Sequence, residues 1–493
     1  MPGRFESQPE RKRKRRPKWQ RMLRKYWPPI RFGLICLLLL LLIIGFISLI
    51  VNLFSTADRK NDKPDVSDTS SSADTTATPD PTMSAAERQA KLIYIMNESA
   101  SMAAGYDYRG AIDLLKSYEG YETNTQMQER VAEYEQLDSQ LVSYDQMDNI
   151  THVFFHSLIV DPSRAFDGDF TQGGYNQYMT TIDEFIAMME SMYEKGYVLV
   201  SPYDVAYEVT DATGTHFTYG DIRLPEGKIP FIMSQDDLNY YGYMIGDVDQ
   251  EFERPAKPTT DGDGFAHKVV IGEDGYPTCE YMDAEGNITT GDYDLVPVLE
   301  KFIKEHPDFS YHGARAVLGM TGYEGVFGYR TKPSYEEKLG SAAYQKEIED
   351  ARAVADCLRE HGWILASHSY GHPSYGELTA DRVEADSDKW EETVQPVIGN
   401  CDIILYPNGS DIAGVEEYTF DNQKFAALYE DGYRYFFNVD SHYAWCQLGD
   451  NYFRAGRRNL DGYRMYYNPE ALADLFEVSE VWDPARPTPV PPI

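Results

Sequence analysis

Residues 363–372 read WILASHSYGH, an apolar run that stops at two histidines four positions apart. Residues 228–237 read KIPFIMSQDD and have the same form, an apolar run that ends in two adjacent acids. Short apolar runs of this kind predict buried strands, and segments with helical spacing lie between them from residue 151 onward. Alternating strands and helices predict an α/β fold built on a parallel sheet.

Polar side chains follow several of the predicted strands. They are His156, Asp236, Asp237, His368, His372, Asn408 and Asp440. In a βα barrel the carboxyl ends of all strands lie at one mouth, so residues far apart in the sequence converge there. A shared site at that mouth is therefore the first functional hypothesis.

Each of these pairs has an ordinary explanation when taken alone. With ten histidines in the chain, His368 and His372 could be solvated loop residues, and Asp236-Asp237 could form a helix N-cap. Together they favour a metal site. Two imidazoles and one carboxylate can hold a catalytic metal with open positions, and the second carboxylate can accept a proton from water.

The N-terminal region has the pattern of a membrane anchor. Residues 1–31 are strongly basic, and residues 32–54 (FGLICLLLLLLIIGFISLIVNLF) carry no charge over the length that a bilayer requires. A signal peptide is the competing interpretation. Signal peptides have a shorter apolar core followed by a small-residue cleavage site, and this stretch has neither feature. The pattern predicts a single-pass cell-membrane protein with a cytoplasmic basic tail and an extracellular catalytic domain.

Composition excludes some classes of protein. The 493 residues include 45 Lys and Arg against 80 Asp and Glu, for a net charge of −35, and 12 of the 45 basic residues lie in the first 31 positions. So acidic a body would be repelled by nucleic acid, which we exclude as a partner. The five cysteines show neither metal-ligand nor disulfide-framework spacing.

The remaining boundaries follow from shifts in composition. Residues 55–83 are rich in Ser, Thr, Asp and Pro and predict a disordered linker. Residues 84–148 predict a helical spacer resembling a tetratricopeptide hairpin, which could dock a protein partner. Residues 149–480 form the predicted catalytic domain, with an insertion at about 246–290 whose DGDG (261–264) predicts a turn rather than a calcium loop. Residues 481–493 are a Pro-rich tail.

The motifs THVFFHSLI, IMSQDDLNYY, ASHSYGH, LYPNG and FFNVDS resemble, in order, those of the polysaccharide deacetylases, the nodulation-type deacetylase domain of carbohydrate esterase family 4. The resemblance extends over residues 151–464. It implies a distorted or seven-stranded (β/α) barrel that removes N-acetyl groups from N-acetylglucosamine-containing polysaccharides such as peptidoglycan or exopolysaccharide.

The resemblance also implies roles for individual residues. Asp236 would be the catalytic base, Ser369 would brace the histidine loop, and the metal would be Zn²⁺, with Co²⁺, Ni²⁺ or Fe²⁺ fitting the same ligands. Asp237, His368 and His372 would be the metal ligands. Substrate and oxyanion contacts would come from His156 and from Tyr406, Pro407, Asn408 and Gly409, chiefly through the backbone N–H of Tyr406.

Two departures from the family pattern matter. The family has an arginine before the Pro-x-Gly turn, where this chain has Leu405 and Tyr406, and a late histidine acting as general acid. The acid could be His442, with Asp440 two residues before it as a further catalytic candidate, or water. Charge could instead be stabilised by Arg454, Arg457 or Arg458. A surface glycan-binding or regulatory protein without turnover is the alternative function, and a hydrolase of small acylated amines or esters is a third.

Overall fold

The computed structural model describes residues 84–246, 262–440 and 444–493. Within these ranges no helix is both long enough and apolar enough to cross a membrane. This finding overturns the predicted single-pass membrane localisation, and we withdraw it. The stretch predicted as the span, residues 32–54, lies outside the described residues, as do the basic tail, the linker at 55–83 and His442.

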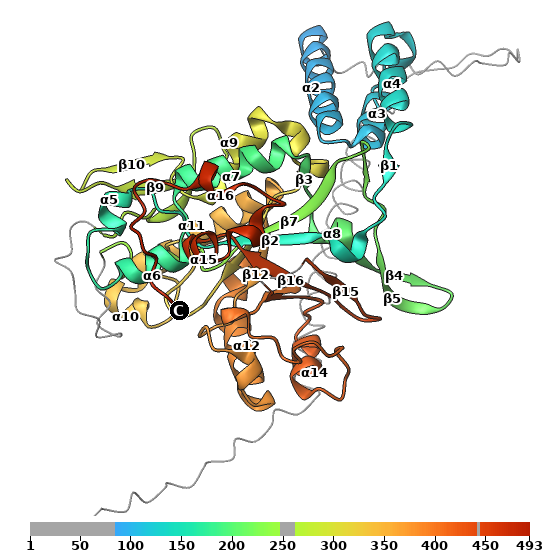
Figure 1. Cartoon of the computed structure of the whole chain (residues 1–493). Coiled ribbons are helices and arrows are strands. Elements are labelled where there is room, and N and C mark those ends of the chain that lie inside the picture. The colour runs from blue at the N-terminus through green and yellow to red at the C-terminus, as the bar shows by residue number, and fades with distance from the viewer. Residues whose placement is uncertain (1–83, 247–261, 441–443) are drawn as a thin grey trace, which may run out of the picture. The chain divides into compact units, whose positions relative to one another are not determined.

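A parallel β-barrel forms the centre of the fold (Figure 1). Its seven strands are β2 (Thr151–Phe155), β7 (Ile229–Gln235), β11 (Val317–Met320), β12 (Ile364–Ser367), β13 (Ile403–Leu405), β14 (Tyr435–Val439) and β16 (Phe453–Asn459). They follow one another around the barrel in chain order, and parallel pairing of β16 with β2 closes it. The predicted (β/α) barrel is confirmed.

The barrel is irregular at two seams. β11 meets β7 only at the end of that strand, and β3 (Tyr197–Leu199) pairs with the beginning of β7. Likewise β2 meets β16 only at the end of that strand, and the antiparallel strand β15 (Cys446–Leu448) pairs with the beginning of β16. The barrel therefore has seven strands and is irregular at the amino ends of these two seams, where β3 and β15 take up the pairing.

Apolar residues fill the barrel and cover it, so both faces of its strands are buried. In β7, Ile232 belongs to the interior core, whereas Phe231 and Met233 pack outward against the helices. A strand covered on both faces reads as a continuous apolar run, which explains the pattern of IPFIM in the sequence. Toward the carboxyl ends of the strands, polar side chains replace this filling.

Helices cover the outer face of the barrel. The longer ones are α7 (Ile182–Glu194), α9 (Leu295–Glu305), α11 (Ser341–Glu360), α12 (Ala380–Thr393) and α14 (Gln423–Glu430). Shorter helices lie in the connections between elements: α5 (Pro162–Ala165), α6 (Gln172–Tyr178), α8 (Pro202–Val205), α10 (Tyr335–Leu339), α13 (Gln395–Ile398), α15 (Gly462–Tyr467) and α16 (Val478–Val481). Helix α7 begins at a capping box in which Thr181 and Glu184 exchange side-chain-to-backbone hydrogen bonds.

Two antiparallel additions flank the barrel. A hairpin joins β4 (Ala206–Asp211) to β5 (Gly214–Tyr219), and a three-stranded sheet joins β8 (Lys268–Ile271), β9 (Pro277–Met282) and β10 (Ile288–Gly291). The sheet occupies the described part of the predicted insertion. Asp263 of the DGDG segment is buried and accepts a hydrogen bond from Tyr175 (2.6 Å), between two glycines with positive φ.

Three helices precede the barrel domain: α2 (Ala85–Ala104), α3 (Tyr108–Lys116) and α4 (Thr125–Asp138). We call α2–α4 the helical module. It is fixed to the barrel domain by pairing of β1 (Val142–Ser143) with β6 (Arg223–Leu224) and by a hydrogen bond from the N–H of His312 to the carbonyl of Gly105 (2.8 Å). Arg223 donates to the Asp138 carboxylate (2.8 Å) and to the carbonyls of Asp138 and Leu141.

The Pro-rich tail packs against the barrel domain. Arg486 forms a fully buried ion pair with Glu184 of α7 and donates to the carbonyl of Asn176 (2.9 Å). Val490 is also buried. The end of the chain is therefore part of this domain, which its extended, proline-rich sequence does not reveal.

The contacts of Arg223 predict how the helical module is held. Replacing Arg223 with Ala leaves Asp138 and two carbonyls without their shared donor, which costs about 1–3 kcal/mol of local stability. Hydrogen exchange should then accelerate in residues 85–141 and stay unchanged in the barrel. Arg109→Ala is the matched control, since Arg109 is exposed and reaches Asp138 only at 3.4 Å. Equal protection in parent and Arg223→Ala would contradict this account.

Candidate metal centre

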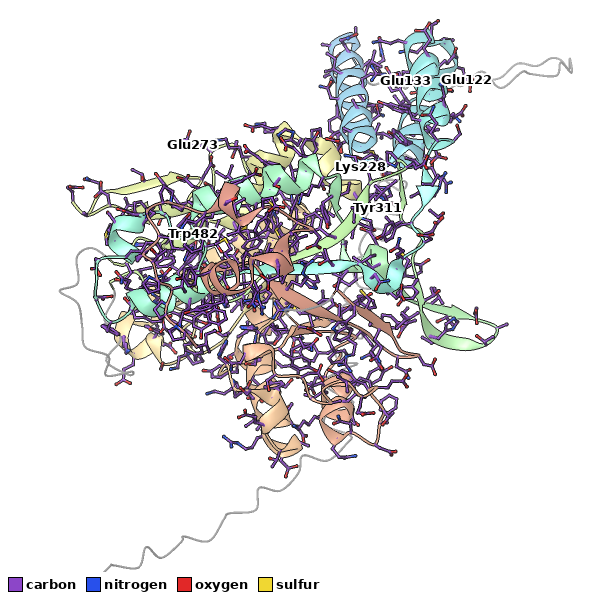
Figure 2. All side chains as sticks on the ribbon, in the orientation of Figure 1. Glu122, Glu133, Lys228, Glu273, Tyr311 and Trp482 are labelled. Carbon is purple, nitrogen blue, oxygen red and sulfur yellow. The ribbon has the colours of Figure 1, made fainter. Side chains whose placement is uncertain are left out.

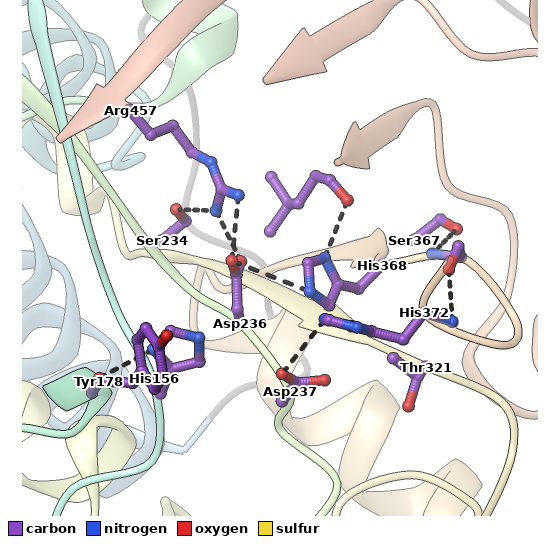
Figure 3. A network of polar contacts seen from close by, with 12 residues as sticks. His156, Tyr178, Ser234, Asp236, Asp237, Thr321, Ser367, His368, His372 and Arg457 are labelled. Atoms are coloured by element: carbon purple, nitrogen blue, oxygen red, sulfur yellow. Dashed lines mark hydrogen bonds and ion pairs between the residues drawn. The ribbon is translucent and has the colours of Figure 1, made fainter. Parts of the chain in front are cut away.

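The polar residues predicted at strand ends do lie at the carboxyl mouth of the barrel. His156 directly follows β2, Asp236 and Asp237 follow β7, and His368 follows β12. Figure 3 shows Asp236 and Asp237 between His156 on one side and His368 with His372 on the other. The barrel thus brings together side chains that are up to 216 positions apart in the sequence, from His156 to His372.

Asp237, His368 and His372 form a cluster with the composition of a metal site. Each offers one ligand atom, and these atoms lie within 4.8 Å of one another. The Nε2 atom of His372 is 3.8 Å from Oδ2 of Asp237, and the two imidazole centroids are 4.9 Å apart. We call these three residues the metal triad.

The hydrogen bonding of His368 fits a metal ligand. Its Nδ1 is 2.8 Å from the carbonyl oxygen of Leu405, which can only accept, so Nδ1 carries the proton and Nε2 is left with its lone pair. A carbonyl behind the coordinating histidine is the usual outer contact in zinc proteins. Burial lowers the pKa of His368, outweighing the neighbouring aspartates, and so favours the neutral ring that binds metal.

Two histidines and one carboxylate suit Zn²⁺ and leave positions open for water and substrate. The donor set fits Co²⁺, Ni²⁺ and Fe²⁺ as well, so the structure does not single out one ion. A second acidic group, Asp388, Glu391 and Asp431, offers oxygen atoms alone and lies on α12 and at the end of α14.

The metal triad sits on strained but well-supported backbone. Asp237 and His372 have left-handed φ values of 57° and 56°, as does Ser369 at 63°. Ser369 accepts a hydrogen bond from the N–H of His372 (2.9 Å), which confirms the predicted bracing role. Tyr241 donates its hydroxyl to Asp237 and contacts Thr321 Oγ1 (2.7 Å). Such strain persists where surrounding contacts fix it, typically at functional sites.

Asp236, the predicted base, is held by an arginine that the sequence left unassigned. Arg457 of β16 makes a two-pronged ion pair with Asp236, at 2.6 Å and 3.0 Å, and also donates to Ser234 (3.2 Å). Both side chains are buried. The guanidinium passes over the ring of Phe154, with 4.5 Å to its centroid, to reach Asp236 from across β2.

This pairing determines the charge of the base. Burial alone would raise the pKa of Asp236, but the charges of Arg457, His368 and His156 outweigh it and lower the pKa below its usual range. Asp236 is therefore ionised at neutral pH. Its nearer oxygen is 3.9 Å from Nε2 of His368, beside the metal triad and outside it.

His156 faces the same carboxylates. Its Nδ1 lies 3.1 Å from the carbonyl of Tyr178, so this nitrogen carries a proton and Nε2 is the atom that can exchange one. Burial would raise the pKa values of Asp236 and Asp237, and His156 is among the neighbouring charges that lower them instead. The structure thus provides a histidine at the mouth, from the first barrel strand.

The LYPNG loop does not present the predicted oxyanion donor. The N–H of Tyr406 donates to the carbonyl of Phe437 (2.8 Å) in the β13–β14 pairing, so it is not available to substrate. The Tyr406 side chain is buried, and Pro407 has no N–H. Gly409 donates to the Tyr406 carbonyl at 3.0 Å, and Asn408 donates its amide to Ser374 (3.2 Å). The prediction for Tyr406 was wrong because this residue continues a strand pairing.

Asp440 follows β14 but turns toward another part of the mouth. The Asp440 carboxylate accepts a hydrogen bond from the indole N–H of Trp445 (2.9 Å). A Cβ added at Gly456 would lie 2.8 Å from the Cβ of Asp440. Gly456 and Arg457 are adjacent in β16 and face opposite sides. Asp440 is therefore on the side away from Asp236, while His442 lies outside the described residues.

The other two candidate arginines have structural partners. Arg454 forms a buried ion pair with Asp411 (3.2 Å), and Arg458 pairs with Asp474 (2.7 Å). Of the three arginines in β16, Arg457 is the one that reaches the predicted base.

Comparisons with known proteins add little to this geometry. No protein-family model matches the sequence, and no curated relative matches it. Among solved structures, a Streptococcus pyogenes deacetylase, PplD, in complex with acetate is similar at 13% identity. The similarity covers 67% of this chain and 98% of that chain with a TM-score of 0.35, a level that carries no functional conclusion.

The Arg457–Asp236 pair predicts a particular dependence of stability on pH. In the metal-free parent protein the pKa of Asp236 is lower in the folded state than in the unfolded state. The stability that Asp236 contributes is therefore complete above the ordinary carboxyl range and is lost as pH falls. In Arg457→Leu the largest charge opposing burial is lost, so the pKa of Asp236 rises and its contribution to stability falls as pH rises. The parent should therefore be more stable than Arg457→Leu by an unfolding free energy that grows between about pH 3 and pH 7 and reaches about 3–5 kcal/mol.

Urea unfolding across that range measures the difference. Arg458→Leu is the control, because its partner Asp474 is half exposed and water can replace the lost guanidinium. Combining Arg457→Leu with Asp236→Asn should recover most of the loss. A difference that is flat with pH would mean that Arg457 does not set the charge of Asp236.

Proposed function

We propose that the chain is a metal-dependent hydrolase that removes N-acetyl groups from a polysaccharide containing N-acetylglucosamine, such as peptidoglycan or exopolysaccharide. One observation carries the proposal: an ionised carboxylate, Asp236, is held by Arg457 beside a separate two-histidine, one-aspartate cluster. A binding site needs the cluster alone. A hydrolase also needs a base that does not ligate the metal.

Asp237, His368 and His372 would hold the metal. A divalent ion there supplies a Lewis acid that polarises a carbonyl oxygen and lowers the pKa of water. Asp236 takes the proton from the attacking water. Arg457 fixes both carboxylate oxygens by its paired hydrogen bonds, which keeps the base oriented and directs it away from ligation.

His156 would protonate the leaving amine. Breaking an amide requires a proton on nitrogen, and Nε2 of His156 remains to carry one because Nδ1 is fixed by the Tyr178 carbonyl. This assignment replaces the late histidine that the resemblance led us to expect, with a residue first predicted to contact substrate.

The alternative, a glycan-binding protein without turnover, depended on two missing groups. In this chain Arg457 of β16 is the cation beside the base, and His156 at the end of β2 is a histidine at the mouth. Their presence favours an enzyme.

Acetate release from N-acetylglucosamine oligomers and peptidoglycan fragments tests the proposal. The zinc-loaded parent should release acetate, and Asp236→Asn and His372→Ala should not. His156→Gln should lose roughly 10²- to 10⁴-fold on these amides but remain near the parent on para-nitrophenyl acetate, whose leaving group needs no proton. No release from any amide by the zinc-loaded parent would overturn the proposed activity.

The same pair of substrates tests where the acid lies. Asp440→Asn and His442→Gln should leave the ratio of amide to ester rates unchanged. If either of them, instead of His156→Gln, shows the selective loss on amides, the proton comes from the loop after β14.

A further inference from the structure

A cavity of about 330 Å³ lies where the helical module meets the barrel domain. Its walls come from residues 106–141 on one side and from residues 203–223 and 311–312 on the other. Tyr311, labelled in Figure 2, lies at this junction. Residues 311–312 precede β11 and Arg223 precedes β7, so the cavity is at the amino end of the barrel, opposite the metal triad. Its volume is within the range of small-ligand sites.

Aromatic rings held by the fold line this cavity. Tyr203 is 39% exposed, yet its hydroxyl donates to Asp402 (2.6 Å) and its ring meets Tyr435 edge to face. Tyr207 of β4 is 44% exposed. His312 stacks on the buried ring of Tyr311 at 3.8 Å. Rigid apolar faces beside polar groups suit the C–H face and hydroxyls of a sugar ring, since little ordering remains to be done on binding.

Four carboxylates line the cavity, against two guanidiniums, Arg109 and Arg223. Asp138 is neutralised by Arg109 and Arg223. Asp107 accepts from the N–H of Gly110 (2.8 Å) and Asp204 from that of Ser201 (2.9 Å). In each of these carboxylates one oxygen accepts a backbone hydrogen bond, whereas a carboxylate can accept about four hydrogen bonds, so capacity remains for a ligand.

These carboxylates favour a cationic ligand. Asp221 adds a further, exposed carboxylate to the lining. Burial raises the pKa of Asp204 to about 6, against the hydrogen bond from Ser201, because the carboxylate is poorly solvated. A cation bound beside Asp204 would stabilise the charged carboxylate. The lining therefore selects against anionic sugars and toward an amine.

Backbone strain marks this cavity as it marks the metal triad. Eight non-glycine residues of the described ranges have positive φ, and three of them, Asp237, Ser369 and His372, belong to or contact the metal triad. Tyr106 (68°) and His312 (51°) line the cavity instead. Left-handed tyrosine and histidine are costly and cluster at functional sites.

We propose that this cavity binds a sugar unit that carries a free, protonated amine, within a polysaccharide chain. The tyrosine faces would pack on the ring, and Asp107, Asp204 and Asp221 would bind the amine and hydroxyls. A free amine is what removal of an N-acetyl group produces, so the cavity would hold already processed polymer. Binding here does not require turnover at the metal triad, so either can fail without the other.

Titration calorimetry with glucosamine oligomers and N-acetylglucosamine oligomers tests the proposal, using the full chain carrying His372→Ala to prevent turnover. Glucosamine oligomers should bind, and Tyr207→Ala and Asp221→Asn should each weaken that binding by about tenfold or more. Exposed residues elsewhere provide the controls, Tyr276→Ala and Asp183→Asn, which should bind as the His372→Ala chain does. In the otherwise unaltered chain, the cavity variants should release acetate as the parent does.

Three results would overturn the proposal. They are no binding of glucosamine oligomers, binding that neither cavity variant weakens, and equal cavity-dependent binding of the N-acetylated oligomers. Tyr207 and Asp221 are both exposed, so their replacement leaves the fold intact, which thermal unfolding of each variant verifies.

Discussion

The buried ion pair between Arg457 and Asp236 is the interaction on which the mouth of the barrel depends. Neither charge could remain there alone, because an unpaired ion in such surroundings costs several kcal/mol. The two residues are on β16 and directly after β7, with β2 between them. Closure of the barrel is what brings them into contact, so the geometry of the base is linked to the last pairing that completes the fold.

The same constraint separates the roles of two adjacent aspartates. Asp236 points along the barrel interior to Arg457, whereas Asp237 adopts a left-handed backbone and turns toward His372. The hydroxyl of Tyr241 holds Asp237 in that orientation. One carboxylate is thereby reserved for proton transfer and the other for ligation. A flexible loop carrying two aspartates would allow both to ligate the same ion.

Much of this arrangement can be predicted from the sequence. Apolar runs ending in polar residues identify the strands and their mouth, and this places Asp237 with His368 and His372 because parallel strands share one polarity. The resemblance to polysaccharide deacetylases assigns the same residues. The resemblance also predicts an arginine before the Pro-x-Gly turn, where this chain has Leu405 and Tyr406.

Arg457 was not singled out because FRAGRRN carries three arginines. Period-two alternation puts Arg457 on the face of Phe453 and Ala455, which line the barrel, and this signal was present in the sequence. The oxyanion assignment to Tyr406 failed for another reason, since the register of β13 against β14 is a tertiary property. Packing of the Pro-rich tail through Arg486 and Glu184 is equally non-local.

The most direct test of the central claim is the position of the metal. Anomalous diffraction from crystals of the zinc-loaded protein should show one ion at about 2.0–2.2 Å from Asp237 and the Nε2 atoms of His368 and His372. Asp236 should remain on Arg457, outside the coordination sphere. An ion that also ligates Asp236, or one bound at Asp388, Glu391 and Asp431 with the triad empty, would contradict the account.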